Sequence, residues 1–257
     1  MEKKKTSWIY RVICWLVRLF SPKMEFDGEK LPDGPCVVVG NHAQMYGPIA
    51  GELYFPESYY IWCAGEMMRW KEVHAYAYRD FWSFKPRWTR WFYRILSVLI
   101  TPLSVCIFNN ARTIPVYHDS RSIGAFRESL RRLQEGGGLL IFPEYNKKHN
   151  NILYDFQDRF IDLARFYYKK TGEELSFVPL YVAPKLAKLC LGEPIRFRAD
   201  APIAQERRRI CEELMAAITA LGCALPEHTV IPYRNIRRRD YPKNRPLEDY
   251  EHEKTDG

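Results

Sequence analysis

The sequence lacks the cysteine pattern of a disulfide framework or of a zinc site. Its 257 residues include seven cysteines, which are odd in number, scattered along the chain and never spaced as C-x-x-C. Such usage is typical of proteins kept reduced in the cytosol. The histidines and acidic residues show no ligand spacing either, so we expect no metal and no prosthetic group.

Internal repeats and low-complexity tracts are also absent, and this excludes solenoid and fibrous architectures. Hydrophobic residues make up 47% of the chain, which is enough for one sizeable core. We therefore predict one main domain over residues 25–225. Residues 1–24 and 226–257 are predicted to flank it.

Acidic residues are fewer than basic ones: the sequence has 31 acidic and 39 basic residues, which gives a net charge of +8. A positive chain favours an anionic partner, which could be nucleic acid, an acidic substrate or a phospholipid surface. Charge alone does not choose among these three classes.

The first apolar run, residues 8–20, is too short to cross a bilayer. Two arginines interrupt it, which a signal peptide would not tolerate. Helical spacing puts the polar residues on one stripe and leaves a broad apolar face, the pattern of a helix lying in a membrane interface. That stripe consists of Lys4, Ser7, Arg11 and Arg18. A helix docked on the protein core would show a similar pattern.

Residues 69–94 combine seven basic and two acidic side chains with many aromatic ones. This mixture suits the stacking of nucleic-acid bases, and it also suits a lipid interface. The next stretch, residues 95–108, is almost wholly apolar, which favours lipid: a shallow hairpin in the membrane or a channel for an acyl chain. A buried helix explains it equally well.

The chemistry is predicted where an apolar strand, residues 36–40, ends in Asn41-His42. Gly47-Pro48 then resembles a helix N-cap followed by a proline at the first helical position. A second apolar strand ends at Pro143-Glu144, after a helical segment. Because parallel strands end at one edge of a sheet, His42 and Glu144 should emerge at the same edge, where ligands bind.

The predicted fold class is therefore α/β, with a mixed, partly parallel sheet flanked by helices and an N-terminal amphipathic helix at the membrane interface. An imidazole at the ligand-binding edge can act as a general base, although a lone histidine is more often structural.

Beyond residue 225 the density of proline and charge, first basic and then acidic, predicts an extended or disordered tail.

Five short blocks in one order resemble the glycerolipid acyltransferase family, typified by bacterial lysophosphatidic acid acyltransferases, from about Phe26 to Leu221. The blocks are Asn41-His42, His118 to Arg121, Phe142-Pro143-Glu144, Val178-Pro179-Leu180 and Gly192-Glu193-Pro194-Ile195. By this resemblance the chain is a divergent member of the family, because three of its positions depart from the family pattern.

The resemblance implies transfer of a fatty acyl group from acyl-CoA or acyl carrier protein to a hydroxyl of a lysophospholipid or glycerol phosphate acceptor, as in phospholipid biosynthesis. It implies no cofactor beyond the acyl donor. The expected partners are an anionic membrane surface, the donor and the lipid acceptor, with no nucleic acid. The expected location is the cytoplasmic face of a membrane, in peripheral or monotopic form.

The same resemblance assigns roles to individual residues. His42 would take the proton of the attacking hydroxyl, and Glu144 would be the second catalytic residue. The expected substrate-binding residues are Asn41, His118, Arg121, Phe142, Pro143 and Tyr145.

Three positions depart from the family pattern. Gly47 stands where the family pairs its histidine with an aspartate, His118 where it has a phosphate-binding arginine, and Tyr145 where it has a glycine. By analogy with serine proteases, loss of the carboxylate that orients a catalytic histidine costs a factor of about 10⁴ in rate.

Another acid could replace the missing aspartate, and the candidates are Glu144, Asp119 and Glu52, with Glu144 favoured by position. If none of them orients His42, a Gly47→Asp change should raise activity. Two alternatives to an active enzyme stay open: a catalytically inactive lipid-binding relative, and a nucleic-acid-binding protein.

Overall fold

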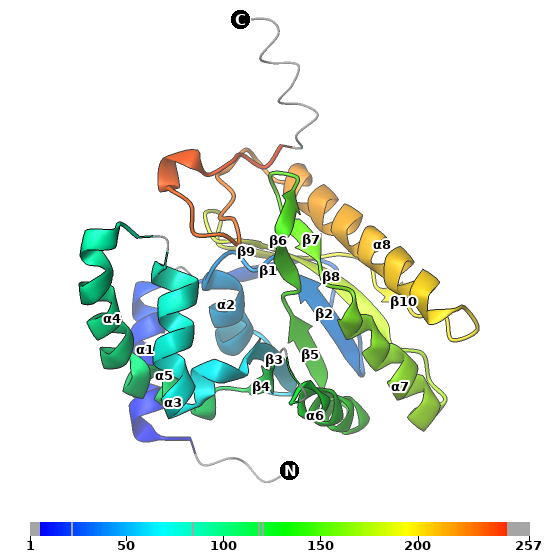
Figure 1. The fold of residues 1–257 in the computed structure, drawn as a ribbon. Helices are drawn as coiled ribbons and strands as arrows, with labels where there is room; N and C mark the ends of the chain where they lie inside the picture. The colour runs from blue at the N-terminus through cyan, green and yellow to red at the C-terminus, as the bar shows by residue number, and fades with distance from the viewer. Residues whose placement is uncertain (1–5, 22, 84, 118, 120, 246–257) are drawn as a thin grey trace, which may run out of the picture. The chain divides into compact units, whose positions relative to one another are not determined.

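The computed structural model describes residues 6–21, 23–83, 85–117, 119 and 121–245 (Figure 1). Contacts within the chain define two compact units, and both are discontinuous in sequence. The first comprises Met1–Ser21 and Tyr60–Glu128, and the second Pro22–Tyr59 and Ser129–Gly257. This division differs from the predicted single domain over residues 25–225.

The second unit contains a mixed, largely parallel sheet with the strand order β1-β9-β8-β2-β5. Strand β2 runs parallel to β5 and β8, β1 runs parallel to β9, and β8 and β9 are antiparallel. The short β10 adds to β8 in the antiparallel sense. Their bounds are β1 Glu25–Gly28, β2 Cys36–Gly40, β5 Gly138–Ile141, β8 Ser176–Ala183, β9 Lys188–Leu191 and β10 Ile195–Arg196.

A separate hairpin of β6 and β7 and several helices complete the second unit. Helix α8 packs along β8, and α7 contacts α8 (Figure 1). These elements are β6 Glu144–His149, β7 Tyr154–Phe156, α2 Tyr46–Tyr54, α7 Asp162–Thr171 and α8 Ile203–Ala224, with short 3-10 turns at Arg159–Ile161 and Arg238–Asp240. The predicted α/β class, a partly parallel sheet flanked by helices, is confirmed.

The core of this unit lies at β2, whose five residues are all buried. Val37 is paired with Leu139 on one side and Phe177 on the other. A strand covered on both faces needs a continuous apolar run, which is why the valines after Cys36 predict it correctly.

Residues 226–245 were predicted to be extended or disordered; they have little regular secondary structure, and several of their side chains are packed against the second unit. Asn244 is buried, and its side chain accepts a hydrogen bond from the His228 N–H (2.8 Å) and donates one to the Gly222 carbonyl (2.9 Å). The composition of the segment does not predict this packing, because only a few of its side chains are buried and the others are polar. Residues 246–257 lie outside the described part.

The first unit consists of helices around a parallel pair of strands, β3 and β4. Helix α1 contacts α5, which in turn contacts α3 and α4 (Figure 1). The elements are α1 Trp8–Phe20, β3 Tyr59–Ala64, α3 Trp70–Ala77, α4 Arg90–Leu99, α5 Thr101–Asn110 and β4 Thr113–Val116, with short turns at Gly65–Met68, Tyr78–Trp82 and Arg87–Thr89. Helix α6, Ser122–Gln134, begins in this unit and ends in the other.

Large apolar side chains of the first unit face outward. On α1 the exposed fraction reaches 73% for Trp8 and 82% for Phe20, and α4 exposes Trp91, Ile95 and Leu99 as well. Among the described residues, no single helix is long and apolar enough to span a membrane. Arg87–Leu99 and Thr101–Asn110 meet that test only as a pair, with a bend of 43° between them.

Candidate active site

His42 is the second residue after β2, at the carboxyl end of the parallel strands. The residue before it, Asn41, is buried, and its side-chain oxygen and nitrogen are both hydrogen-bonded inside the sheet. It accepts a hydrogen bond from the Val182 N–H (2.7 Å) and donates one to the Val182 carbonyl (3.2 Å). Asn41 therefore fixes where β2 ends against β8, which differs from the predicted substrate-binding role.

The backbone after His42 folds into a left-handed turn. Ala43 has a φ of 45° and Gln44 a φ of 54°, a conformation that costs a non-glycine residue about 1–2 kcal/mol. This turn brings the Gln44 carbonyl onto the imidazole, where it is hydrogen-bonded to Nδ1. Since a carbonyl only accepts, Nδ1 carries the proton and Nε2 keeps its lone pair.

None of the described residues pairs with Nε2, so this atom can accept a proton from a substrate. The ring is packed edge-on between Phe142 (centroids 5.4 Å apart) and Tyr233 (5.5 Å). Burial lowers the pKa of His42 to about 4, which keeps the imidazole neutral at physiological pH. The arrangement leaves a neutral imidazole that is held by a peptide carbonyl at Nδ1 and keeps a lone pair at Nε2.

Glu144 reaches His42 as predicted, but it contacts the backbone and not the ring. One carboxylate oxygen accepts a hydrogen bond from the His42 N–H (2.5 Å), and the other accepts one from the Tyr154 N–H (2.8 Å). Burial raises the pKa of Glu144 to about 7, against the effect of these two donors. Glu144 thus anchors the loop, which corrects the expectation that it orients the imidazole.

Gly47 lies within α2, which begins at Tyr46, one residue before the predicted N-cap. Its N–H donates a hydrogen bond to the His42 carbonyl (3.1 Å). A Cβ at this position would lie 2.7 Å from that carbonyl oxygen and 2.7 Å from the Phe142 ring. The position therefore has no room for an aspartate, and the idea that Gly47→Asp could supply the missing acid fails on sterics.

Two further predicted residues lie beside the loop. Pro143 is buried, and its carbonyl accepts a hydrogen bond from the Gln157 N–H (2.9 Å). Tyr145 is half-buried, with the Lys147 ammonium 6.0 Å from its ring centroid. Both lie in the second unit with His42.

Arg121 belongs to the first unit, and its guanidinium is already paired. It binds Asp119 (2.8 Å) and Glu72 (3.0 Å), and it lies over the Tyr117 ring at 3.7 Å. The two carboxylates raise the pKa of Arg121 further above its usual range. Asp119, one of the acids considered for His42, is thereby engaged with Arg121.

His118 lies outside the described residues, and Glu52 lies in α2.

Sequence reasoning missed three residues that complete the loop: Gln44, Tyr233 and Tyr241. The Gln44 side-chain amide donates a hydrogen bond to the Tyr241 hydroxyl (2.8 Å), across 197 residues of sequence. The two tyrosines stand in a proline-rich, charged segment, where no periodicity distinguishes them from solvated residues.

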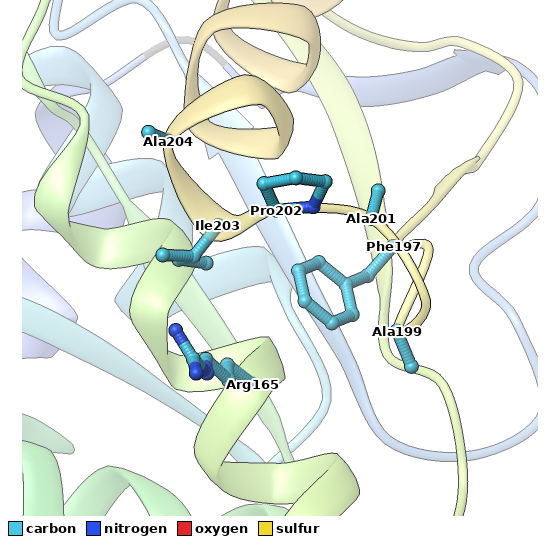
Figure 2. Close-up of a pocket in the computed structure, with 7 residues that line it drawn as sticks. All are labelled: Arg165, Phe197, Ala199, Ala201, Pro202, Ile203 and Ala204. Atoms are coloured by element: carbon cyan, nitrogen blue, oxygen red, sulfur yellow. The ribbon is translucent and has the colours of Figure 1, made fainter.

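A cavity of about 370 Å³ lies elsewhere in the second unit, at the N-terminus of α8 (Figure 2). Its lining is mostly alanine, proline and other apolar side chains, with the Arg165 guanidinium at one side. Its lining contains neither a nucleophile nor a general base. No cluster of three or more potential metal ligands occurs within the described residues.

No protein-family model and no curated protein matches this chain. Among solved structures, the chain is similar to the 1-acyl-sn-glycerophosphate (LPA) acyltransferase PlsC from Thermotoga maritima. The two share 14% sequence identity over 84% of this chain and 83% of the other, with a TM-score of 0.47. A similarity at this level concerns the course of the backbone.

Proposed function

We propose that this protein is a membrane-associated O-acyltransferase with His42 as its general base. The observation that carries the proposal is the hydrogen bond between His42 Nδ1 and the Gln44 carbonyl, which leaves Nε2 as a proton acceptor at the carboxyl end of β2. The order of the sequence blocks around His42 and Glu144 supports acyl transfer over another base-catalysed reaction.

In this proposal, Nε2 of His42 takes the proton of an acceptor hydroxyl as its oxygen attacks the carbonyl carbon of an acyl thioester. The tetrahedral intermediate collapses, the carbon–sulfur bond breaks, and the imidazolium returns its proton to the leaving thiolate. The Gln44 carbonyl holds the ring through both proton transfers. The donor is acyl-CoA or acyl carrier protein, and the acceptor is a lysophospholipid or glycerol phosphate.

The proposed location is the cytoplasmic face of an anionic membrane. Support comes from the exposed apolar side chains of α1 and α4, because soluble monomers rarely expose so many large apolar residues together. Arg11 and Arg18 on α1 carry the positive charge that anionic lipid would attract.

The second candidate function is that of a lipid-binding protein without catalysis. It is favoured by the absence of room for a carboxylate at Gly47 and by the depressed pKa of His42, which makes the imidazole a weak base. Under this alternative the membrane surface is retained and no acyl group moves.

Mass spectrometry of lipids after incubation with acyl-CoA or acyl carrier protein and a panel of lysolipids separates the two functions. Wild type should form diacyl product, and His42→Ala should lose most of it. His74→Ala is the matched control, because His74 is exposed on α3. Product formation that survives in His42→Ala at the wild-type rate would refute the role of His42, and no product from wild type would favour the lipid-binding alternative.

A further inference from the structure

The segment of residues 226–245, here called the C-terminal strap, forms a closed loop on the second unit. The Val230 N–H donates a hydrogen bond to the Pro242 carbonyl (2.9 Å), and the Asn244 N–H donates one to the His228 carbonyl (3.2 Å). The two ends of the strap are therefore tied together.

The strap is also fixed to the sheet. His228 is buried, and its Nε2 is hydrogen-bonded to the Tyr181 hydroxyl of β8 (2.9 Å). Its Nδ1 is hydrogen-bonded to the Pro226 carbonyl (2.8 Å). Since β8 lies beside β2, which carries His42 at its end, the strap and the His42 loop are attached to neighbouring strands.

Two strap residues contact the His42 loop directly. The Tyr241 hydroxyl accepts a hydrogen bond from the Gln44 side-chain amide (2.8 Å), and the Tyr233 ring packs edge-on against the imidazole. The Gln44 residue held by Tyr241 is the same residue whose carbonyl holds Nδ1 of His42.

We infer that Tyr241 is a positioning residue for His42, acting through Gln44 from the C-terminal strap. Ala43 and Gln44 occupy a left-handed conformation that both would leave if unrestrained, because only glycine and asparagine adopt it at little cost. The bond to Tyr241 restrains Gln44 from its side-chain end, and so fixes the carbonyl that selects the tautomer of the ring. The catalytic consequence rests on the proposed function, whereas the effect on the ring does not.

Tyr241→Phe tests the inference, because it removes the hydroxyl and keeps the ring. Gln44→Asn is the second variant: asparagine tolerates the left-handed backbone, and its amide is one methylene too short to reach Tyr241. Tyr168→Phe, at an exposed tyrosine of α7, is the matched control. Steady-state kinetics, thermal unfolding and the ¹⁵N resonances of the His42 ring are measured for each variant.

Wild type should show a neutral ring with the proton on Nδ1. In Tyr241→Phe and in Gln44→Asn the ring resonances should shift towards a mixture of tautomers. The value of kcat should fall about three- to tenfold, with KM for both substrates unchanged. The double variant should be no worse than either single one, because the two changes break one hydrogen bond.

Ring resonances that stay as in wild type in both variants would overturn the inference, whatever happens to the rate. An equal loss of kcat in Tyr168→Phe would overturn it as well. If wild type transfers no acyl group, the proposed function fails, and the ring resonances still decide the role of Tyr241.

Discussion

At the scale of single residues, His42 is oriented by a peptide carbonyl, whereas the catalytic histidine of serine proteases is oriented by a carboxylate. A carbonyl fixes the tautomer, but its partial charge stabilises the imidazolium less than a full negative charge would. Burial acts in the same direction, since it disfavours the charged ring. As the proposed general base, His42 is therefore neutral at physiological pH and only weakly basic.

The pH dependence of acyl transfer should reveal this difference. The pKa of His42 is lowered to about 4, so the imidazole stays unprotonated, and able to take a proton, from neutral pH down to about pH 5. We expect kcat/KM to stay level over this range and to fall as the pH approaches 4. Circular dichroism at each pH checks that the protein is folded. A base limb with a midpoint at or above the ordinary value of 6.5 would contradict this prediction.

Gly47 is the residue whose substitution should be most damaging in the His42 loop. Gly47→Ala places a Cβ 2.7 Å from the His42 carbonyl oxygen, so the loop or α2 must shift. We expect a loss of about 1–3 kcal/mol in the free energy of unfolding, measured by urea denaturation, together with a loss of transfer activity. Gly47→Asp should behave in the same way.

Gly124→Ala is the control for this substitution. Gly124 lies inside α6, and a Cβ there meets no atom within 4 Å. Alanine is the better helix former, so this variant should gain about 0.5–1 kcal/mol. A Gly47→Ala variant as stable as Gly124→Ala would refute the steric argument.

At the scale of secondary-structure elements, the successful predictions came from regular patterns of apolar residues. The apolar runs that form β2 and β5 were predicted as buried strands, and parallel pairing brought Glu144 to His42. Helix α1 follows its amphipathic pattern closely.

The parts of the site that escaped prediction depend on single long-range contacts. The left-handed turn at Gln44 leaves no signal in composition, because glutamine rarely adopts it. The C-terminal strap is held by Asn244 and His228. From sequence alone, polar residues of these types are predicted to lie in solvent, and only their hydrogen-bond partners in the fold show that they are buried.

At this scale we predict that helix α1 binds the membrane surface. Trp8 and Trp15 are 73% and 61% exposed, and each should enter the lipid interface. Replacing both with serine should weaken binding to vesicles of phosphatidylglycerol and phosphatidylcholine by about tenfold or more, measured by sedimentation. The physical reason is the loss of apolar area that lipid would cover.

Phe166→Ser is the control, because Phe166 is 46% exposed on α7 in the second unit. It should bind vesicles as wild type does at the same salt concentration. Equal sedimentation of the Trp8/Trp15 double variant and wild type would show that α1 does not bind membranes.

At the scale of the whole molecule, the stability of the fold should depend on two half-buried histidines. Burial lowers the pKa of both His42 and His149 to about 4, below the value of 6.5 in the unfolded chain. The unfolded state therefore binds protons more readily between pH 6.5 and 4, and the folded state loses stability as the pH falls through this window. Each histidine accounts for at most ~3 kcal/mol.

Glu144 opposes this trend, because its pKa is raised to about 7. Its protonated form stabilises the folded state below pH 4.5, and that contribution is lost as the pH rises through 7. We expect urea denaturation to show a net loss of stability from pH 6.5 to 4, and His149→Phe should reduce it. An unchanged unfolding free energy across this window in wild type would contradict the prediction.

The order of synthesis gives the C-terminal strap a further consequence. Tyr241 lies 197 residues after Gln44, so a ribosome adding 5–20 residues per second needs roughly 10–40 s to supply it once Gln44 has been made. During that interval the nascent chain contains His42 without the partner that steadies its loop. The reactive geometry is thus assembled late in translation, when most of the fold that surrounds it has already been synthesised.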